Sequence, residues 1–255
     1  MTLYIRVLSG GVEVQTDNRE RVPLQPLAAA ALGLLVAVGG RSGISRQHMK
    51  DMLWGLDDDF DRNASLKVTM SKLRKVLGGD RVIYAHDRYR FIGHERDYVD
   101  LRVSRLLTAR ADHLRFDDPA RAAGLYEQAL DLWVDSPMTG LPYSPAAAGY
   151  LNALRNEQQV IVESMVETML SAGRHREAAA KTPVLVAADP LNEHLRSLRM
   201  VALARSGQKA LALLEYESAE AAVMAGAGAK PGLALRTLRR KIINDDPSLE
   251  WTRSM

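Results

Sequence analysis

The spacing of apolar and polar positions predicts short strands at the start of the chain, followed by a buried helix. Apolar and polar residues alternate through residues 3–24, between turns rich in glycine and asparagine, which predicts a small antiparallel meander. Pro26 then precedes an apolar run that Gly39 and Gly40 close. A proline suits the first turn of a helix, and apolar residues on all sides indicate that this helix is buried.

Two further helices are predicted before residue 80. Ser45 can cap the first, over residues 46–54, because its hydroxyl can accept a hydrogen bond from an amide of the first turn. The second covers residues 62–77 and ends at a Gly-Gly pair. At about 3.6 residues per turn, its apolar stripe consists of Leu66, Met70, Leu73 and Leu77.

The other side of the 62–77 helix is basic. The segment holds five Lys or Arg residues and no Asp or Glu, which suits a polyanion such as nucleic acid. Val68 is the apolar exception on this side, and a β-branched side chain there can contact a thymine methyl group in the major groove. The alternative interpretation is an amphipathic surface helix whose lysines are only solvated.

A hairpin is predicted directly after this helix. Residues 81–93 read as two short strands, with His86 and Arg88 at the tip and Arg90 two residues on. Strands, three helices and a basic hairpin follow the order of a winged helix-turn-helix, whose last helix enters the major groove while the hairpin reaches a flanking groove or phosphate. We therefore predict an α+β winged helix-turn-helix, a DNA-binding domain, over residues 1–95.

The pattern changes near residue 97 to alanine-rich helical periodicity. Three segments share a pattern, in which a turn is followed by small residues and one bulky residue. The second and third of them begin 34 residues apart, which is the period of tetratricopeptide repeats. These segments are 118–130, 173–181 and 207–216. A loop at 135–145 explains why the first and second segments lie farther apart than the second and third. We predict an all-α tetratricopeptide-like domain of helical hairpins over residues 96–255, in which Pro183 kinks one helix or ends it early.

Several stretches in both halves resemble known bacterial families. In the first half they are L-L-V-A-V-G-G-R (34–41), I-S-R-Q-H-M-K-D-M-L-W-G (44–55), S-L-K-V-T-M-S-K-L-R-K-V-L-G (65–78) and R-Y-R-F (88–91). In the second they are L-W-V-D-S-P-M-T-G-L (132–141), D-P-L-N-E-H-L-R (189–196), A-R-S-G-Q-K-A-L (204–211) and K-P-G-L-A-L-R-T-L-R-R-K-I (230–242). The first half resembles an OmpR-type winged helix, and the second resembles the bacterial transcriptional activator domain.

Together the halves resemble the Streptomyces antibiotic regulatory proteins. This resemblance implies a DNA-binding transcriptional activator that contacts direct repeats near a promoter and recruits RNA polymerase. We expect a homodimer on double-stranded DNA, with the helical half contacting polymerase subunits. Two alternatives stay open, which are a repressor and an adaptor or scaffold that does not bind DNA and uses the winged helix as a protein-binding surface.

Charge distribution favours the DNA-binding interpretation. Residues 1–95 hold 14 Lys or Arg against 11 Asp or Glu, and the rest of the chain holds 20 of each, so the net excess of three positive charges lies in the N-terminal part. An adaptor has no evident reason to keep the lysines of the 62–77 helix free of acids. The absence of cysteine excludes disulfides and thiolate metal sites. No leader and no apolar stretch of about 20 residues is present, so we expect a cytoplasmic protein that does not enter a membrane.

Catalysis is not indicated by any motif. The sequence contains no nucleotide-binding loop and no G-x-S-x-G, and its six histidines lack metal-ligand spacing. The aspartates at 57–61 lack the glycine and the terminal glutamate of a calcium loop, so they are better read as a solvated turn. In OmpR-type winged helices this loop can contact RNA polymerase, so the resemblance offers polymerase contact as an alternative to a solvated turn. We predict no enzyme activity, no cofactor and no metal.

The predicted DNA contacts lie mainly on the basic helix. Val68, Ser71, Lys72 and Lys75 are expected near the groove floor, with Lys67 and Arg74 on flanking phosphates. Arg74 also lies close to the leucine stripe, so an intramolecular ion pair is an alternative for it.

Four further arginines are candidates outside this helix. Arg88 or Arg90 can enter a narrow minor groove, and the alternative is a solvated hairpin tip. Strand periodicity puts these two on one face and Tyr89 on the other, toward the core. Arg41 and Arg46 are expected to hold phosphates beside the second helix.

Overall fold

A computed structural model describes residues 2–55, 62–142 and 144–251. The chain packs as two compact units. The N-terminal unit contains Met1–Leu107 and Gln128–Gln159, and the C-terminal unit contains Thr108–Glu127 and Val160–Met255. This is a division by packing, whereas the predicted domain boundary after residue 95 rests on composition and stays a prediction.

A three-stranded sheet opens the N-terminal unit. Its strands, in spatial order, are β2 (Glu13–Thr16), β1 (Leu3–Arg6) and β6 (Tyr98–Val99). The predicted meander is wrong in its third strand. After β2 the chain forms a single bridge between Gln15 and Arg21 and no third strand beside it. The third position is taken by β6, which pairs in parallel with β1.

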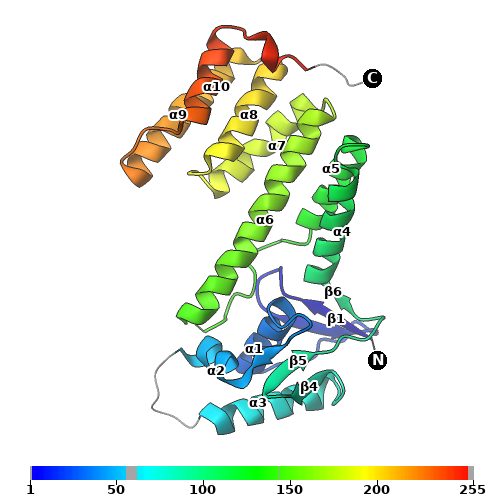
Figure 1. The fold of residues 1–255 in the computed structure, drawn as a ribbon. Coiled ribbons are helices and arrows are strands. Elements are labelled where there is room, and N and C mark those ends of the chain that lie inside the picture. The colour runs from blue at the N-terminus through cyan, green and yellow to red at the C-terminus, as the bar shows by residue number, and fades with distance from the viewer. Residues whose placement is uncertain (1, 56–61, 143, 252–255) are drawn as a thin grey trace. The chain divides into compact units, whose positions relative to one another are not determined.

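Three helices and a second sheet follow in the order shown in Figure 1. The helices are α1 (Pro26–Ala37), α2 (Arg46–Trp54) and α3 (Arg62–Leu77). The strands are β3 (Ile44–Ser45), β4 (Val82–Ala85) and β5 (Arg88–Phe91), with β5 between the other two. The predicted helices and the hairpin are confirmed, whereas the two-residue strand β3 was not predicted.

Local sequence signals explain these helices. Ser45 caps α2, since its hydroxyl accepts a 3.2 Å hydrogen bond from the amide of His48. The leucine stripe of α3 is completely buried and packs against α1, which is itself buried on most sides. Burying a leucine or methionine side chain contributes roughly 1.5–3 kcal/mol each. The stripe therefore fixes which face of α3 is turned away from the core.

Two buried aspartates tie the start of helix α4 (Asp100–Leu114) to the first sheet. Asp100 accepts hydrogen bonds from the amides of Val7 and Leu8, at 2.8 and 2.9 Å. Asp97 accepts one from the amide of Leu3 and forms an ion pair with buried Arg81 at 3.1 Å. These bonds satisfy amides that would otherwise be buried without a partner.

The segment between helices α5 (Pro119–Leu130) and α6 (Pro145–Ser171) also belongs to the N-terminal unit. The amide of Met138 donates to the carbonyl of Val7, and the Ser144 hydroxyl donates to the carbonyl of Met52, at 3.0 and 2.9 Å. Gly33 of α1 permits this approach, because a Cβ atom there would lie 2.9 Å from the sulfur of Met138. Met138 and Ser144, in the loop predicted from the sequence, thus contact the residue after β1 and helix α2.

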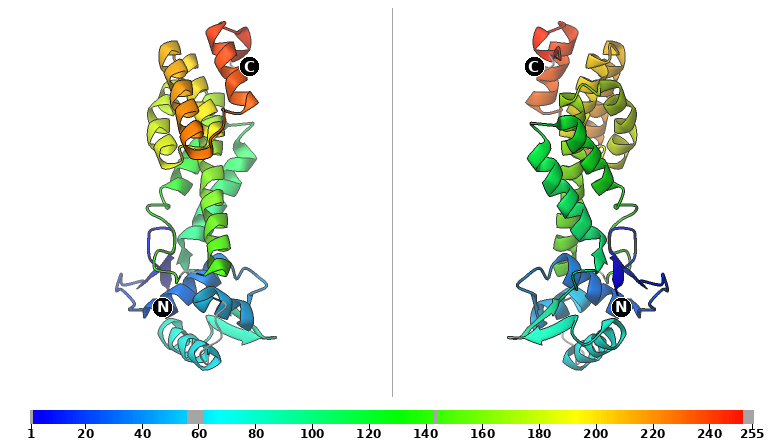
Figure 2. Two further views of the ribbon diagram at one scale, coloured as in Figure 1. Left: turned by 90° about the vertical axis from the view of Figure 1, so that its left-hand side faces the viewer. Right: turned by 90° about the vertical axis from the view of Figure 1, so that its right-hand side faces the viewer.

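The rest of the chain is helical, and its elements are shown from two sides in Figure 2. They are α5 (Pro119–Leu130), α6 (Pro145–Ser171), α7 (His175–Ala188), α8 (Glu193–Arg205), α9 (Lys209–Ala227), α10 (Leu233–Ile243) and a short 3-10 helix (Pro247–Leu249). Each of the three repeated segments begins the second helix of a consecutive pair, as predicted, and α8 packs against α9, which confirms the third hairpin. In the described part of the chain, no helix is long and apolar enough to cross a membrane.

Pro183 does not end its helix, contrary to one of the two predicted outcomes. Helix α7 continues through Pro183 to Ala188. A proline leaves the carbonyl four residues before it without an amide donor, and that residue is Ala179. The single hydroxyl hydrogen of Thr182 is shared between the carbonyls of Ala178, at 2.9 Å, and Ala179, at 3.3 Å, so the freed carbonyl receives only the longer contact.

Candidate nucleic-acid interface

The side of α3 opposite the leucine stripe forms an exposed basic surface. Lys67, Ser71, Lys72 and Lys75 are all exposed, as predicted. Val68 lies among them with 52% of its surface exposed, although it is apolar. We call these five residues the α3 basic face.

Lys72 is held toward the start of α1. Its Nζ donates a 2.8 Å hydrogen bond to the side-chain oxygen of Gln25, the residue that precedes α1. Beside this pair lies a hollow of about 490 Å³ whose lining includes Leu27 and Val68. The α3 basic face is thus continuous with an apolar recess at the start of α1. The sequence analysis missed Gln25, because its partner is 47 residues away and no local pattern marks such a contact.

Two residues of α3 serve the fold. Thr69 is buried, and its hydroxyl donates to the carbonyl of Ser65 at 2.8 Å. Arg74 directs its Nε to the carbonyl of Val82 at 2.6 Å. Arg74 therefore joins α3 to the β4–β5 hairpin through a hydrogen bond, and not through the ion pair considered from the sequence.

The hairpin has a two-residue tip. His86 and Asp87 both have positive φ angles, of 52° and 58°, which is typical of a type I′ turn. The Asp87 carboxylate lies 3.1 Å from Nε of Arg46, and the Tyr84 hydroxyl donates to it at 2.6 Å. This bond raises the pKa of Tyr84. Arg46 is thus partly neutralised by the tip of the hairpin.

Arg88 and Arg90 project from the face of β5 opposite the buried Tyr89, as predicted. Arg88 donates to the carbonyls of Ser42 and Gly43, each at 2.7 Å. Arg90 donates through Nη1 to the carbonyl of Arg41 at 3.0 Å. Both side chains therefore brace the loop before α2, a role that strand alternation alone does not reveal.

The acidic residues predicted as a solvated turn lie at 57–61, outside the described residues. Among the described residues, no group of three or more His, Cys, Asp or Glu side chains is placed to hold a metal ion.

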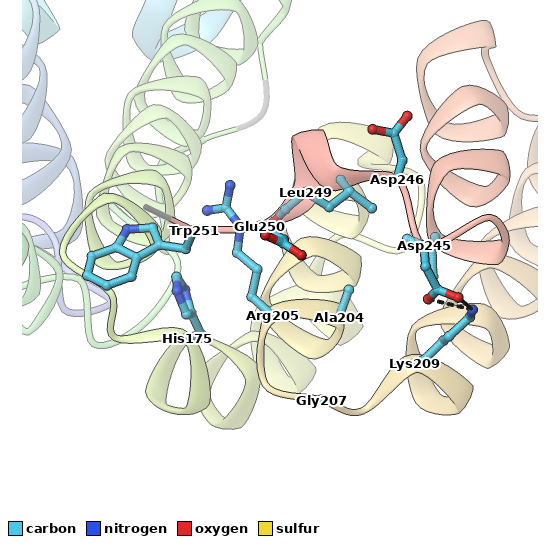
Figure 3. A pocket seen from close by; sticks show the side chains of 11 residues that line it. His175, Ala204, Arg205, Gly207, Lys209, Asp245, Asp246, Leu249, Glu250 and Trp251 are labelled. Atoms are coloured by element: carbon cyan, nitrogen blue, oxygen red, sulfur yellow. Dashed lines mark hydrogen bonds and ion pairs between the residues drawn. The ribbon is translucent and has the colours of Figure 1, made fainter. Parts of the chain in front are cut away.

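A separate cavity of about 530 Å³ lies in the C-terminal unit, under the segment that follows α10 (Figure 3). Two of its basic groups already have partners. Lys209 forms an ion pair with Asp245 at 2.7 Å, and Nε of Arg205 donates to the carbonyl of Leu249 at 2.9 Å. We therefore assign no ligand to this cavity.

The ring of His175 lies beside this cavity, edge-on to Trp251, with 5.4 Å between the ring centroids (Figure 3). Both ring nitrogens are buried and have no hydrogen-bond partner among the described residues. Burial, together with the positive charge of Arg205, lowers the pKa of His175.

Comparison with known proteins identifies the class. Residues 99–243 match the bacterial transcriptional activator domain. The chain is 32% identical over 225 residues to regulatory protein AfsR of Streptomyces griseus, which is 88% of this chain and 23% of that protein. It is 30% identical over 241 residues to AfsR of Streptomyces coelicolor, which is 94% of this chain and 24% of that protein. The chain thus spans about a quarter of the length of these relatives.

The chain belongs to the bacterial transcriptional activator domain family, and over most of its length it is similar to the Streptomyces regulatory proteins named above. Its fold is also that of Mycobacterium tuberculosis EmbR, solved in complex with a low-affinity phosphopeptide. The TM-score is 0.85 at 22% identity, over 96% of this chain and 66% of that chain.

Proposed function

We propose that this protein is a sequence-specific transcriptional activator that binds promoter DNA with the α3 basic face and recruits RNA polymerase through its helical part. In this proposal the N-terminal unit contains a winged helix-turn-helix, α3 is the recognition helix and the β4–β5 hairpin is the wing. The observation that carries it is the α3 basic face itself. Three exposed lysines surround an exposed valine on a helix that has no acid between Arg62 and Leu77.

The proposed DNA contacts of α3 differ with the chemistry of each side chain. Val68 and Ser71 have short side chains and are assigned to base edges, with Val68 on a thymine methyl group. Lys67, Lys72 and Lys75 are assigned to bases or phosphates at the groove. Arg74 can contact a DNA phosphate only through its terminal nitrogens, since its Nε donates to the carbonyl of Val82.

The arginines of the hairpin and of the second helix are assigned to flanking phosphates. These are Arg41, Arg46, Arg88 and Arg90. Arg88 and Arg90 are held by main-chain carbonyls, which are uncharged, so their positive charge is kept for an anion. Arg46 instead faces Asp87, and it contributes to DNA binding only when that ion pair opens.

Polymerase contact is assigned to the helical part. Leu211 and Leu214 on α9 expose 49% and 57% of their surfaces, and apolar groups exposed on a helix are typical of protein-binding surfaces. Two copies on direct repeats about one helical turn apart would lie on one side of the duplex.

Capture of genomic fragments by the purified whole chain tests this proposal. We expect enrichment of promoter fragments that share a directly repeated motif. A protein that folds normally but enriches no fragment would be an adaptor, and the proposal would be wrong. A transcription assay on the captured promoters then separates an activator from a repressor by the sign of the effect.

A further inference from the structure

A second hollow in the N-terminal unit is lined by arginines and contains no acid. It has a volume of about 650 Å³ and lies where β5, the loop before α2 and the first turns of α4 meet. Four of its twelve lining residues are Arg41, Arg90, Arg102 and Arg105, and none is Asp or Glu. Like charges gathered around one hollow repel one another, so such a cluster suits a bound anion.

Three of the four positive charges are not matched by a carboxylate. Arg105 forms a bidentate pair with Glu157, at 2.7 and 2.8 Å. Arg90 is bonded only to a main-chain carbonyl, and its buried Nε has no partner among the described residues. Over residues 2–55, 62–142 and 144–251, the side chains of Arg41 and Arg102 form neither a hydrogen bond nor an ion pair.

The remaining wall of the hollow is apolar and includes Leu35 and Phe91. A ligand that fits this combination has a compact group with two or more negative charges, joined to an apolar body. Phosphate is the favoured group, because the planar fork of arginine binds phosphate oxygens in pairs. The volume suits a small organic molecule.

We propose that this hollow, the arginine hollow, binds a small organic phosphate, either a monoester or a diphosphate of an apolar body. Arg102 and Arg41 hold the phosphate group, Arg90 supports it, and the wall around Phe91 covers the body. The inference does not depend on DNA binding. Arg41 and Arg90 are also among the DNA contacts proposed above, whereas Arg102 is not, so Arg102→Gln is the variant that tests the hollow separately.

The test is a calorimetric titration of the whole chain with 1-naphthyl phosphate, which joins a phosphate dianion to an aromatic body. We expect saturable binding that pyrophosphate displaces, whereas 1-naphthol, which lacks the phosphate, does not bind. Arg102→Gln and Arg41→Gln should each weaken binding by about tenfold or more, as expected for loss of a charge-assisted hydrogen bond. Arg110→Gln, an exposed arginine further along α4 that does not line the hollow, is the matched control and should bind as wild type.

Three results of the titration would overturn the proposal, and a fourth result comes from DNA binding. They are no saturable binding, equal weakening by Arg110→Gln, and binding that neither Arg102→Gln nor Arg41→Gln changes. The other source of phosphate is the DNA backbone, and it is tested separately. If Arg102→Gln leaves 1-naphthyl phosphate binding intact but weakens DNA binding and lowers its salt dependence, the hollow serves DNA and the proposed ligand is wrong.

Discussion

Lys72 and Gln25 lie 47 residues apart in the chain, yet the lysine Nζ is 2.8 Å from the glutamine side-chain oxygen. The contact joins the exposed side of α3 to the start of α1. It directs one ammonium group to a defined place next to Val68. The α3 basic face is therefore partly preorganised before any partner binds.

Replacing Gln25 by glutamate should weaken DNA binding. The new carboxylate would pair with Lys72 and repel a phosphate, so one cationic contact is lost. We expect the slope of log binding constant against log salt concentration to fall in magnitude by about one. The measurement is fluorescence anisotropy of a labelled promoter duplex. Gln208→Glu, the same change at the residue preceding α9, is the matched control and should leave the slope unchanged.

The contact assigned to Val68 can be tested from the DNA side. Replacing one thymine of the bound site by deoxyuridine removes only the methyl group. We expect a loss of about 1 kcal/mol at one position for the wild-type protein. With Val68→Ala the same replacement should have almost no effect, because the partner is already absent. If both proteins respond equally at every thymine, Val68 does not contact a methyl group.

Asp100 should be important for the stability of the N-terminal unit. Its carboxylate accepts from the amides of Val7, Leu8 and Leu101. Asparagine offers one acceptor oxygen and an NH₂ group that cannot accept, so at least one buried amide loses its partner. We expect Asp100→Asn to lower the free energy of unfolding by about 1–3 kcal/mol.

Denaturation and hydrogen exchange at Val7, Leu8 and Leu101 measure the effect of Asp100→Asn, because Val7 and Leu8 bond to one carboxylate oxygen and Leu101 to the other. Asp131→Asn, at an exposed position, is the control. If exchange at all three amides is as slow in Asp100→Asn as in wild type, the aspartate does not anchor the sheet.

The C-terminal unit should lose stability in mild acid because of His175. Its pKa in the folded state lies below the ordinary value of about 6.5. The unfolded chain therefore binds more protons between the two pKa values, and stability falls as pH decreases below about 6.5. Above that pH the ring is neutral in both the folded and the unfolded chain, so it does not lower the stability.

Thermal unfolding between pH 5 and 8 measures this effect. His175→Phe should remove the part of the decrease that is due to this ring, whereas His113→Phe, at an exposed position, should retain it. A decrease of the same size in both variants would show that other groups control the acid response.

The predictions from sequence were most accurate where the physical cause is local. The helix at Arg62–Leu77 has the predicted bounds, because its apolar period and the glycines after it lie within the segment. The same is true of the helix capped by Ser45. The exposed position of Val68 also follows from helical period alone.

The predictions failed where the cause is distant in the chain. The third strand of the first sheet is Tyr98–Val99, and no pattern in residues 3–24 reports a partner so far away. The sequence also did not reveal that main-chain carbonyls of the loop at 41–43 hold Arg88 and Arg90, whose predicted DNA contacts stay predictions. At Pro183 the helix continues to Ala188, which the proline alone does not predict.

The salt dependence of promoter binding by Lys72→Ala/Lys75→Ala tests the central claim most directly. If both lysines contact phosphates, the slope of log binding constant against log salt concentration falls in magnitude by about two relative to wild type. Lys230→Ala, an exposed lysine of the C-terminal unit, should leave the slope unchanged. A double variant that binds promoter DNA with the wild-type affinity and slope would contradict the assignment of α3 as the DNA-binding helix.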